Sequence, residues 1–428
     1  MDTEFSFVLD QFCRKYQLSD RPEIGYGLQE DSSVRISDEG RAFLSNREMP
    51  SLEDVRWYNF GDCSLPILFH DGSDTLFTQR GSNVDIHFDL FAESFFWLSG
   101  WQEIINHKRD QYGRFPWKES LQYRWDITEI PVVNYFFRLL AEQLQISPSR
   151  KTFTLALTHD IDAIYGWKED ALNCLKHLHL NGVCRNVKSA ITREPTWQNL
   201  EELADAAAIY QAQASFYFLA GQGSIEGIPH ADYDIQSPYM QQLAARLEQR
   251  GCETGIHPSA GTHEEAALLK KDLSTLDRKI TGGRFHFLKF DMAKTPSVLE
   301  EAGLQYDSTL GFAEHIGFRN GNADPFYLFD HHNQRPTPVA ELPLAIMDTT
   351  FRNPDYMGIS PAEIPESASR VIDEFQKFGG TGAVLWHNYM FSNFKYHSWK
   401  EAYINLLKLL HQKGAQMTSA DRALQEYR

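Results

Sequence analysis

The sequence is poor in cysteine, lacks long apolar runs and has fewer basic than acidic side chains. Its cysteines are odd in number and widely spread, which excludes a disulfide framework. They are Cys13, Cys63, Cys174, Cys184 and Cys252. No stretch approaches the roughly 18 consecutive apolar residues of a membrane helix. The first residues include Asp2 and Glu4 and lack the basic and apolar parts of a signal peptide. These absences predict a cytoplasmic protein with no membrane span.

The acidic excess also limits the partners of the chain. The 58 acidic and 41 Lys and Arg side chains give a formal net charge of −17, and no strongly basic run offsets it. This charge argues against non-specific nucleic-acid binding and against an anionic membrane surface. The sequence also lacks a Walker A lysine motif and a Gly-x-Ser-x-Gly elbow, so two common kinds of catalytic loop are excluded.

The length of 428 residues predicts two domains. Residues 1–148 are rich in aromatic side chains, with helices predicted over 89–103 and 131–144 and a turn at 112–116. We expect this part to be a smaller α+β accessory domain.

Residues 149–428 alternate between strand-like and helical patterns. The predicted strands are 153–157, 214–220, 253–256 and 383–386, and the predicted helices are 167–177, 197–211, 237–250, 263–280 and 399–413. Repeated βα units predict a parallel sheet or barrel covered by helices, in which catalytic side chains gather at the carboxyl ends of the strands.

Two aspartates one residue apart, Asp160 and Asp162, follow the first of these strands. Carboxylates this close repel each other unless they share a cation or a proton. A metal ion on one would leave the other free to accept a proton from water. The alternative is a helix cap beside a turn aspartate, which is common after strands. The polar residues at other strand ends favour the metal site.

Histidines follow two further strand-like segments. His257 ends the strand at 253–256 and is fixed by Pro258, which suits a metal ligand. A third cluster is predicted to place Arg284 and His286 on the same side of a strand. His263, six residues after His257, would be out of phase with it on a helix and could reach the same site only from a loop.

His387 follows the late strand at 383–386 and could protonate a leaving amine. Asp348 follows an apolar run and could orient His387 through a hydrogen bond. The alternative for Asp348 is a helix cap.

Taken in order, these motifs resemble the polysaccharide deacetylase superfamily, carbohydrate esterase family 4, with its NodB-homology fold. The segment at 158–162 resembles the first motif of that family, and His257 resembles the second. Arg284 is similar to the arginine of the third motif, and Leu385 with His387 to the fifth. The likeness is closer to a subgroup that carries an uncharacterised N-terminal domain, and it extends over nearly the whole chain. It implies a distorted (β/α) barrel over 149–428.

The resemblance implies a hydrolase that removes acetyl from an N-acetylated sugar or glycoconjugate with one divalent metal ion. Zinc suits a site of one aspartate and two histidines, although other ions fit. By this likeness Asp160 is the base, oriented by Arg284, and Asp162 and His257 bind the metal.

The resemblance also assigns the remaining site residues. His387 is the acid, with Asp348 as its partner, and Trp386 either lines the acetyl pocket or belongs to the core. The second motif of the family has two histidines, but position 261 is glycine here. The third metal ligand is therefore His286 or His263, and His286 is preferred because it lies beside Arg284 and recurs in the closer subgroup.

Two other functions remain open at this stage. The same scaffold could hydrolyse a non-sugar amide or an O-acetyl ester, since a fold does not fix a substrate. A metal-free carbohydrate-binding or scaffolding protein is the second alternative, and the incomplete second motif favours it. The oligomeric state is not predicted.

Overall fold

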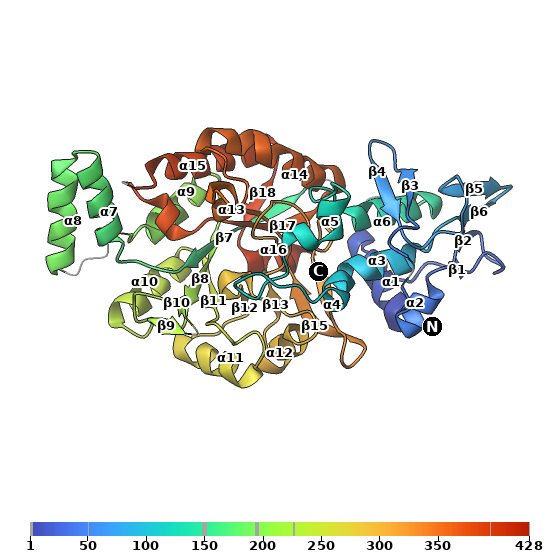
Figure 1. Cartoon of the computed structure of the whole chain (residues 1–428), viewed down its shortest axis with the longest axis horizontal. Coiled ribbons are helices and arrows are strands. Elements are labelled where there is room, and N and C mark those ends of the chain that lie inside the picture. Colours follow the sequence, from blue (N-terminus) through green and yellow to red (C-terminus); the bar gives the residue numbers. More distant parts are fainter. Residues whose placement is uncertain are drawn as a thin grey trace.

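The computed structural model describes residues 3–49, 51–147, 152–192, 197–225, 227–393 and 395–427. A helix-covered sheet forms the middle of the molecule, and the N-terminal region packs on one side of it (Figure 1). The domain boundary predicted at 148/149 lies outside the described residues.

The main sheet has ten strands and curls into a nearly closed barrel. Its pairing order begins with β14 (Phe326–Asp330), β15 (Arg335–Glu341), β13 (Tyr306–Asp307), β12 (Gly282–Gly283) and β11 (Glu253–His257). It continues through β8 (Ala214–Leu219), β7 (Thr154–Ile161), β17 (Thr381–Leu385) and β16 (Leu344–Met347), and β18 (Gln416–Thr418) also pairs with β7.

The pairings from β15 through to β16 are parallel, whereas β14 is antiparallel to β15. Only Leu342 and Pro343 connect β15 to β16, although these strands lie near opposite ends of the pairing order. The sheet must therefore curl until its edges approach each other. The predicted distorted (β/α) barrel is confirmed.

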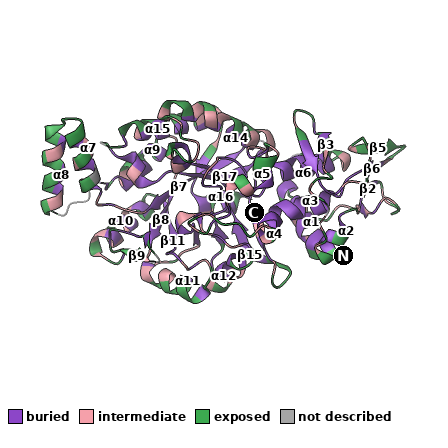
Figure 2. Cartoon of the chain, in the orientation of Figure 1, coloured by how far each residue is buried: buried purple, intermediate pink, exposed green. Residues whose placement is uncertain are grey.

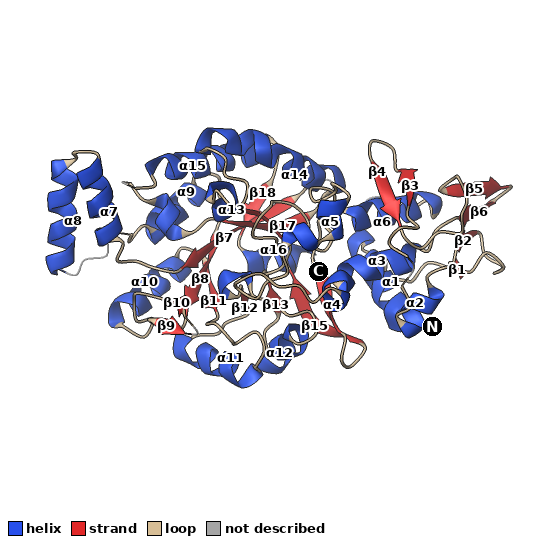
Figure 3. Ribbon diagram, viewed as in Figure 1, coloured by secondary structure: helices blue, strands red, loops and turns tan. Residues whose placement is uncertain are grey.

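Helices cover the outside of the barrel (Figure 3). They include α9 (Leu200–Ala208), α10 (Pro238–Gln249), α11 (Ala266–Leu273), α12 (Thr295–Ala302), α14 (Ile364–Phe378) and α15 (His397–Gln412). On α14 the buried side chains recur every three or four residues, as in a helix with one apolar face.

The helix predicted over 263–280 is wrong in extent. In the structure, α11 ends at Leu273 and a single 3-10 turn follows, Ser274–Leu276. The hydroxyls of Ser274 and Thr275 donate to the carbonyls of Lys271 and Asp272, and such bonds compete with continuation of the helix.

The N-terminal region combines helices with small sheets, as expected. Its helices include α1 (Thr3–Tyr16), α3 (Leu90–Leu98), α4 (Trp101–Ile105) and α6 (Val132–Gln143). One sheet joins β1 (Gly25–Tyr26), β2 (Val34–Ile36), β6 (Asn83–Ile86) and β5 (Phe77–Arg80), and β3 (Arg56–Asn59) pairs with β4 (Ser64–Ile67). The helix predicted over 89–103 is broken at Gly100, whose φ of +65° favours glycine.

The N-terminal region and the barrel share one continuous hydrophobic core, seen as buried elements on both sides of their junction (Figure 2). A buried ion pair crosses the junction, with Nη2 of Arg319 2.7 Å from Oε2 of Glu103 and Nε 2.8 Å from Oε1. Asn134 donates to Asp324 at 2.6 Å nearby. The barrel and the N-terminal region are therefore firmly attached to each other.

Candidate metal centre

The polar residues singled out in the sequence meet at the carboxyl ends of the barrel strands. Asp160 and Asp162 come from the end of β7, His257 from β11 and His387 from the end of β17. Together with His286 they line one cavity of about 210 Å³. Parallel strands place their carboxyl ends at the same rim, which is why residues far apart in sequence converge here.

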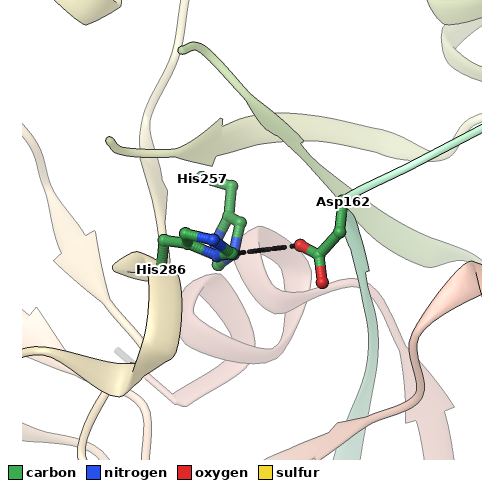
Figure 4. Close-up of side chains that lie close together, drawn as sticks. All are labelled: Asp162, His257 and His286. Carbon is green, nitrogen blue, oxygen red and sulfur yellow. Dashed lines mark hydrogen bonds and ion pairs between the residues drawn. The ribbon is translucent and has the colours of Figure 1, made fainter. Parts of the chain in front are cut away.

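Asp162, His257 and His286 form a cluster whose ligand atoms all lie within 4.8 Å of one another (Figure 4). Oδ1 of Asp162 is 3.4 Å from Nε2 of His257 and 3.8 Å from Nδ1 of His286. In tetrahedral zinc sites with bonds of about 2.0–2.1 Å, neighbouring ligand atoms lie about 3.3 Å apart. The three side chains thus have suitable spacing for one small cation.

Hydrogen bonds fix which nitrogen of each histidine carries the proton. Nδ1 of His257 lies 2.6 Å from the carbonyl oxygen of Arg284, and Nε2 of His286 lies 2.9 Å from that of Pro229. A carbonyl can only accept, so both of these nitrogens are donors. In the neutral rings, the other two nitrogens carry lone pairs, and they face each other at 2.9 Å.

Two lone pairs at this distance, beside a carboxylate, require a proton or a metal ion between them. Burial lowers the pKa of His286 to about 4, so its ring is neutral at pH 7. Burial also lowers the pKa of His257, but the carboxylates of Asp160 and Asp162 outweigh it and raise this pKa. The donor set of one carboxylate and two neutral imidazole nitrogens fits a divalent transition metal.

The carboxylate of Asp162 is also poised for a cation. Among the described residues, its Oδ1 is buried and accepts no hydrogen bond. Burial raises the pKa of Asp162, but the closeness of His257 and the charge of His387 outweigh it and hold this pKa below its usual range. An ionised, underused oxygen is what a metal ligand requires.

Arg284 holds the carboxylate of Asp160, which lies outside the three-residue cluster. Nη1 of the fully buried Arg284 donates to Oδ1 of Asp160 at 2.9 Å and to the hydroxyl of Thr158 at 3.0 Å. Its remaining groups donate to the carbonyl and hydroxyl oxygens of Ser308 at 2.7 and 3.0 Å. Because all of these bonds fix the guanidinium plane, Asp160 is held in one orientation.

His387 and Asp348 form a second buried acid–base pair. Nδ1 of His387 lies 2.7 Å from Oδ1 of Asp348, whose other oxygen accepts from the backbone N–H of His387 at 2.7 Å. Burial alone lowers the pKa of His387, but the charge of Asp348 outweighs it and raises this pKa to about 9. The imidazole is therefore protonated at neutral pH, with Nε2 3.8 Å from Asp162.

Two details differ from the sequence-based expectation. Trp386 does not line the cavity, because neighbouring strand residues point to opposite faces and Leu385 and His387 face inward. Trp386 instead packs in the core beside Tyr403 and Trp399. Arg284 and His286 do not share a strand side, since β12 ends at Gly283 and the chain then turns.

The structure brings His286, and not His263, to the cluster. His286 follows β12 on a tight turn in which Phe287 and Leu288 have φ values of +60° and +53°. These left-handed conformations are costly for large side chains. His263 instead packs its ring on Phe285, 6.2 Å between centroids.

The outer wall of the cavity was not predicted from the sequence. It is formed by Tyr112 and Arg114 of the N-terminal region together with Phe287, Arg352, Tyr356 and Tyr389 of the barrel. Asp110 shapes this wall by accepting from the backbone N–H groups of Tyr112 and Arg114 at 2.8 and 2.9 Å. Arg114 also donates to the hydroxyl of Tyr356 at 3.0 Å, which joins the two regions at the rim. The predicted turn at 112–116 was the only available hint.

Comparison with known proteins gives one family model that matches part of the chain and several similar solved structures. A family model described as a family of unknown function, DUF7033, matches residues 2–147. No curated protein matches the chain.

Among solved structures, the chain is similar to a protein of Mycobacterium smegmatis assigned as a polysaccharide deacetylase. The identity is 14% and the TM-score 0.43, over 66% of this chain and 92% of that one. A CE4 family pseudoenzyme from Bacillus anthracis matches at 10% identity and a TM-score of 0.35, over 65% and 66% of the two chains. The peptidoglycan deacetylase PdaC from Bacillus subtilis, in a mutant form, matches at 13% and 0.27, over 66% and 93%. The function proposed next rests on this chain's own side chains.

Proposed function

We propose that the chain is a metal-dependent hydrolase that removes acetyl from an N-acetylated sugar or glycoconjugate. One observation carries the proposal. A three-ligand cluster, a carboxylate held by an arginine and a histidine held by an aspartate all face one cavity. Amide hydrolysis needs an activated water, a base and an acid, and these groups can supply all three functions.

Asp162, His257 and His286 would hold the metal. When bound, a divalent ion such as zinc supplies a Lewis acid that polarises the carbonyl group and lowers the pKa of water. The two histidines are kept in place by the carbonyl groups of Arg284 and Pro229, which fix the ring orientations.

Asp160 is the general base in this proposal. Arg284 occupies its Oδ1, so the other oxygen is left to accept a proton from the attacking water. The hydrogen bond from the guanidinium prevents the carboxylate from rotating away from the cavity. Arg284 is therefore a positioning residue rather than one that contacts substrate.

His387 is the general acid. Its pKa of about 9 keeps Nε2 protonated at neutral pH. Nε2 can then donate this proton to the departing nitrogen as the carbon–nitrogen bond breaks. Asp348 orients the ring and stabilises the imidazolium. Acetate and a free amine would be the products.

The outer wall supports a carbohydrate as the rest of the substrate. The rings of Tyr112 and Phe287 lie 5.0 Å apart at the mouth of the cavity, and Tyr356 and Tyr389 also line it. Flat aromatic faces with hydroxyl groups suit a sugar ring, which has apolar faces and a polar edge. Tyr112 would thus make the N-terminal region part of substrate binding.

Acetate release tests the proposal. The chain, stripped with a chelator and reloaded with zinc, should release acetate from N-acetylhexosamine oligomers faster than from O-acetylated ones. Faster release of acetate from O-acetyl substrates would show that the chain is an esterase rather than an amidase. If no divalent metal binds, the proton between His257 and His286 is the cation of the site, and the carbohydrate-binding alternative replaces the enzyme.

A further inference from the structure

A helical hairpin projects from the barrel at the end opposite the N-terminal region (Figure 1). It consists of α7 (Trp167–Lys176) and α8 (Leu180–Thr192), joined by His177, Leu178 and His179. The ribbon of the hairpin is mostly green in Figure 2, the colour of exposed residues. Several of these exposed residues have large apolar side chains. They are Leu172, Leu175, Leu178, Leu180, Val187 and Ile191, with Leu178 82% and Ile191 78% exposed.

The hairpin has its polar residues inside and its apolar residues outside. The buried positions of α8 are Gly182, Asn186 and Ser189, which are small or polar. Asn186 donates to the carbonyl of Gly182 at 3.0 Å and lies 3.9 Å from Sγ of the buried Cys174 on α7. A helix of a globular protein normally turns its apolar face inward. This reversal indicates that the outer face is covered by something else.

The apolar residues of the two helices share one side of the hairpin. Leu175 directly follows the inward-facing Cys174, and Val187 directly follows the inward-facing Asn186. In an antiparallel pair, positions that follow the inner residues by one step lie on the same side of both helices. Leu172 lies one turn from Leu175, and Ile191 one turn from Val187, so each pair extends the same face.

The charge of the hairpin is opposite to that of the chain. Residues 167–192 contain Lys168, Lys176, Arg185 and Lys188 against Glu169 and Asp170, a formal charge of +2, whereas the whole chain has a formal charge of −17. Lys176 and Lys188 are exposed beside the apolar face. An apolar helix face flanked by lysines is the pattern of helices that lie in the surface of an anionic membrane.

We propose that the α7–α8 hairpin docks the protein on an anionic lipid bilayer, with Leu175 and Ile191 entering the interfacial region and the lysines meeting lipid headgroups. None of the described helices combines the length and apolar character needed to span a bilayer, so the hairpin would lie on the membrane surface. The negative net charge opposes binding of the rest of the chain to an anionic membrane. It does not oppose binding through the hairpin, whose own surface is basic.

A second copy of the chain fits the apolar face of the hairpin less well than a bilayer does. Helices of 10 and 13 residues are about 15 and 20 Å long, which gives the pair a face of roughly 400 Å². Stable protein interfaces cover about 800 Å² on each partner. Pairing two hairpins would also bring like charges together.

Vesicle sedimentation of the full chain tests the proposal. We expect the protein to pellet with vesicles of phosphatidylcholine and phosphatidylglycerol, but not with phosphatidylcholine alone, and to be released by high salt. The affinity of the double variant Leu175→Ser/Ile191→Ser for the vesicles should fall at least about tenfold. The double variant Lys176→Glu/Lys188→Glu should lose the preference for the anionic lipid.

Ile209→Ser is the matched control, because Ile209 is 75% exposed but lies after α9, away from the hairpin. It should bind vesicles as the unaltered protein does. All of these side chains are exposed, so thermal unfolding should remain unchanged. Failure of the unaltered chain to bind anionic vesicles would overturn the proposal. A dimer in solution that the Leu175→Ser/Ile191→Ser variant dissociates would overturn it in favour of a second copy.

Discussion

Nε2 of His257 and Nδ1 of His286 face each other at 2.9 Å, and each ring already donates its other N–H to a backbone carbonyl. Two histidines arranged in this way cannot form a hydrogen bond unless one gains a proton. With Asp162 beside them, they form an electron-rich pocket that a divalent ion would stabilise. The predicted roles of the surrounding residues follow from this arrangement.

Asp160→Asn should abolish most activity without removing metal. An amide cannot accept the proton from water, so we expect kcat to fall about 10²- to 10⁴-fold. Asp160 is not in the ligand cluster, so the bound metal per chain should remain that of the unaltered protein. Loss of metal together with activity would show that Asp160 is a ligand and not the base.

Asp348→Asn should change the pH dependence of the reaction. His387 must be protonated to act as an acid, and its pKa of about 9 means that kcat should fall as the pH rises through that value. Asp348 supplies the charge that raises this pKa, so in the variant the alkaline fall should begin at a lower pH. We also expect kcat at neutral pH to drop about 100-fold, because the ring is no longer oriented. An unchanged alkaline limb would exclude His387 as the acid.

Tyr112→Ala should weaken substrate binding more than chemistry. Loss of the ring that pairs with Phe287 should raise KM about tenfold and leave metal content unchanged. Tyr112→Phe should keep most of the binding because the ring remains. Trp57→Ala is the control, since Trp57 is an exposed aromatic residue of the same region on β3. Equal effects of the two alanine variants would show that Tyr112 acts only through stability.

Glu103→Gln should destabilise the junction between the two regions. It leaves Arg319 buried without its counter-ion, which typically costs about 3–5 kcal/mol in the free energy of unfolding. Glu119→Gln removes the half-buried partner of the exposed Lys108 in the same region and should cost less than about 1 kcal/mol. Urea unfolding of both variants measures the difference. Similar midpoints would show that the buried pair does not hold the regions together.

Much of the barrel follows from local sequence. Apolar runs ended by polar residues predict the strands and place Asp160, Asp162, His257 and His387 at one rim, because parallel strands share their direction. The choice between His286 and His263 could not be made in this way. It depends on the turn after β12, where Phe287 and Leu288 adopt left-handed conformations that no residue pattern predicts.

The remaining features depend on contacts between distant segments. The choice between pocket and core for Trp386 was open in the sequence, and strand alternation turns this side chain toward Tyr403 in the core. The contribution of Tyr112 and Arg114 to the cavity depends on how the N-terminal region packs against the barrel, through pairs such as Glu103 and Arg319. The helix α8 was not predicted. The outward direction of its apolar residues could not be predicted either, because a sequence pattern cannot distinguish an exposed apolar face from a core face.

Metal content is the most direct test of the proposed centre. The unaltered protein and the variants His286→Ala and His263→Ala should be stripped with a chelator, reloaded with zinc and assayed for bound metal per chain. We predict one ion per chain in the unaltered protein and in His263→Ala, and none in His286→Ala. An unaltered protein that binds no divalent ion, or a loss of metal in His263→Ala but not in His286→Ala, would contradict the account.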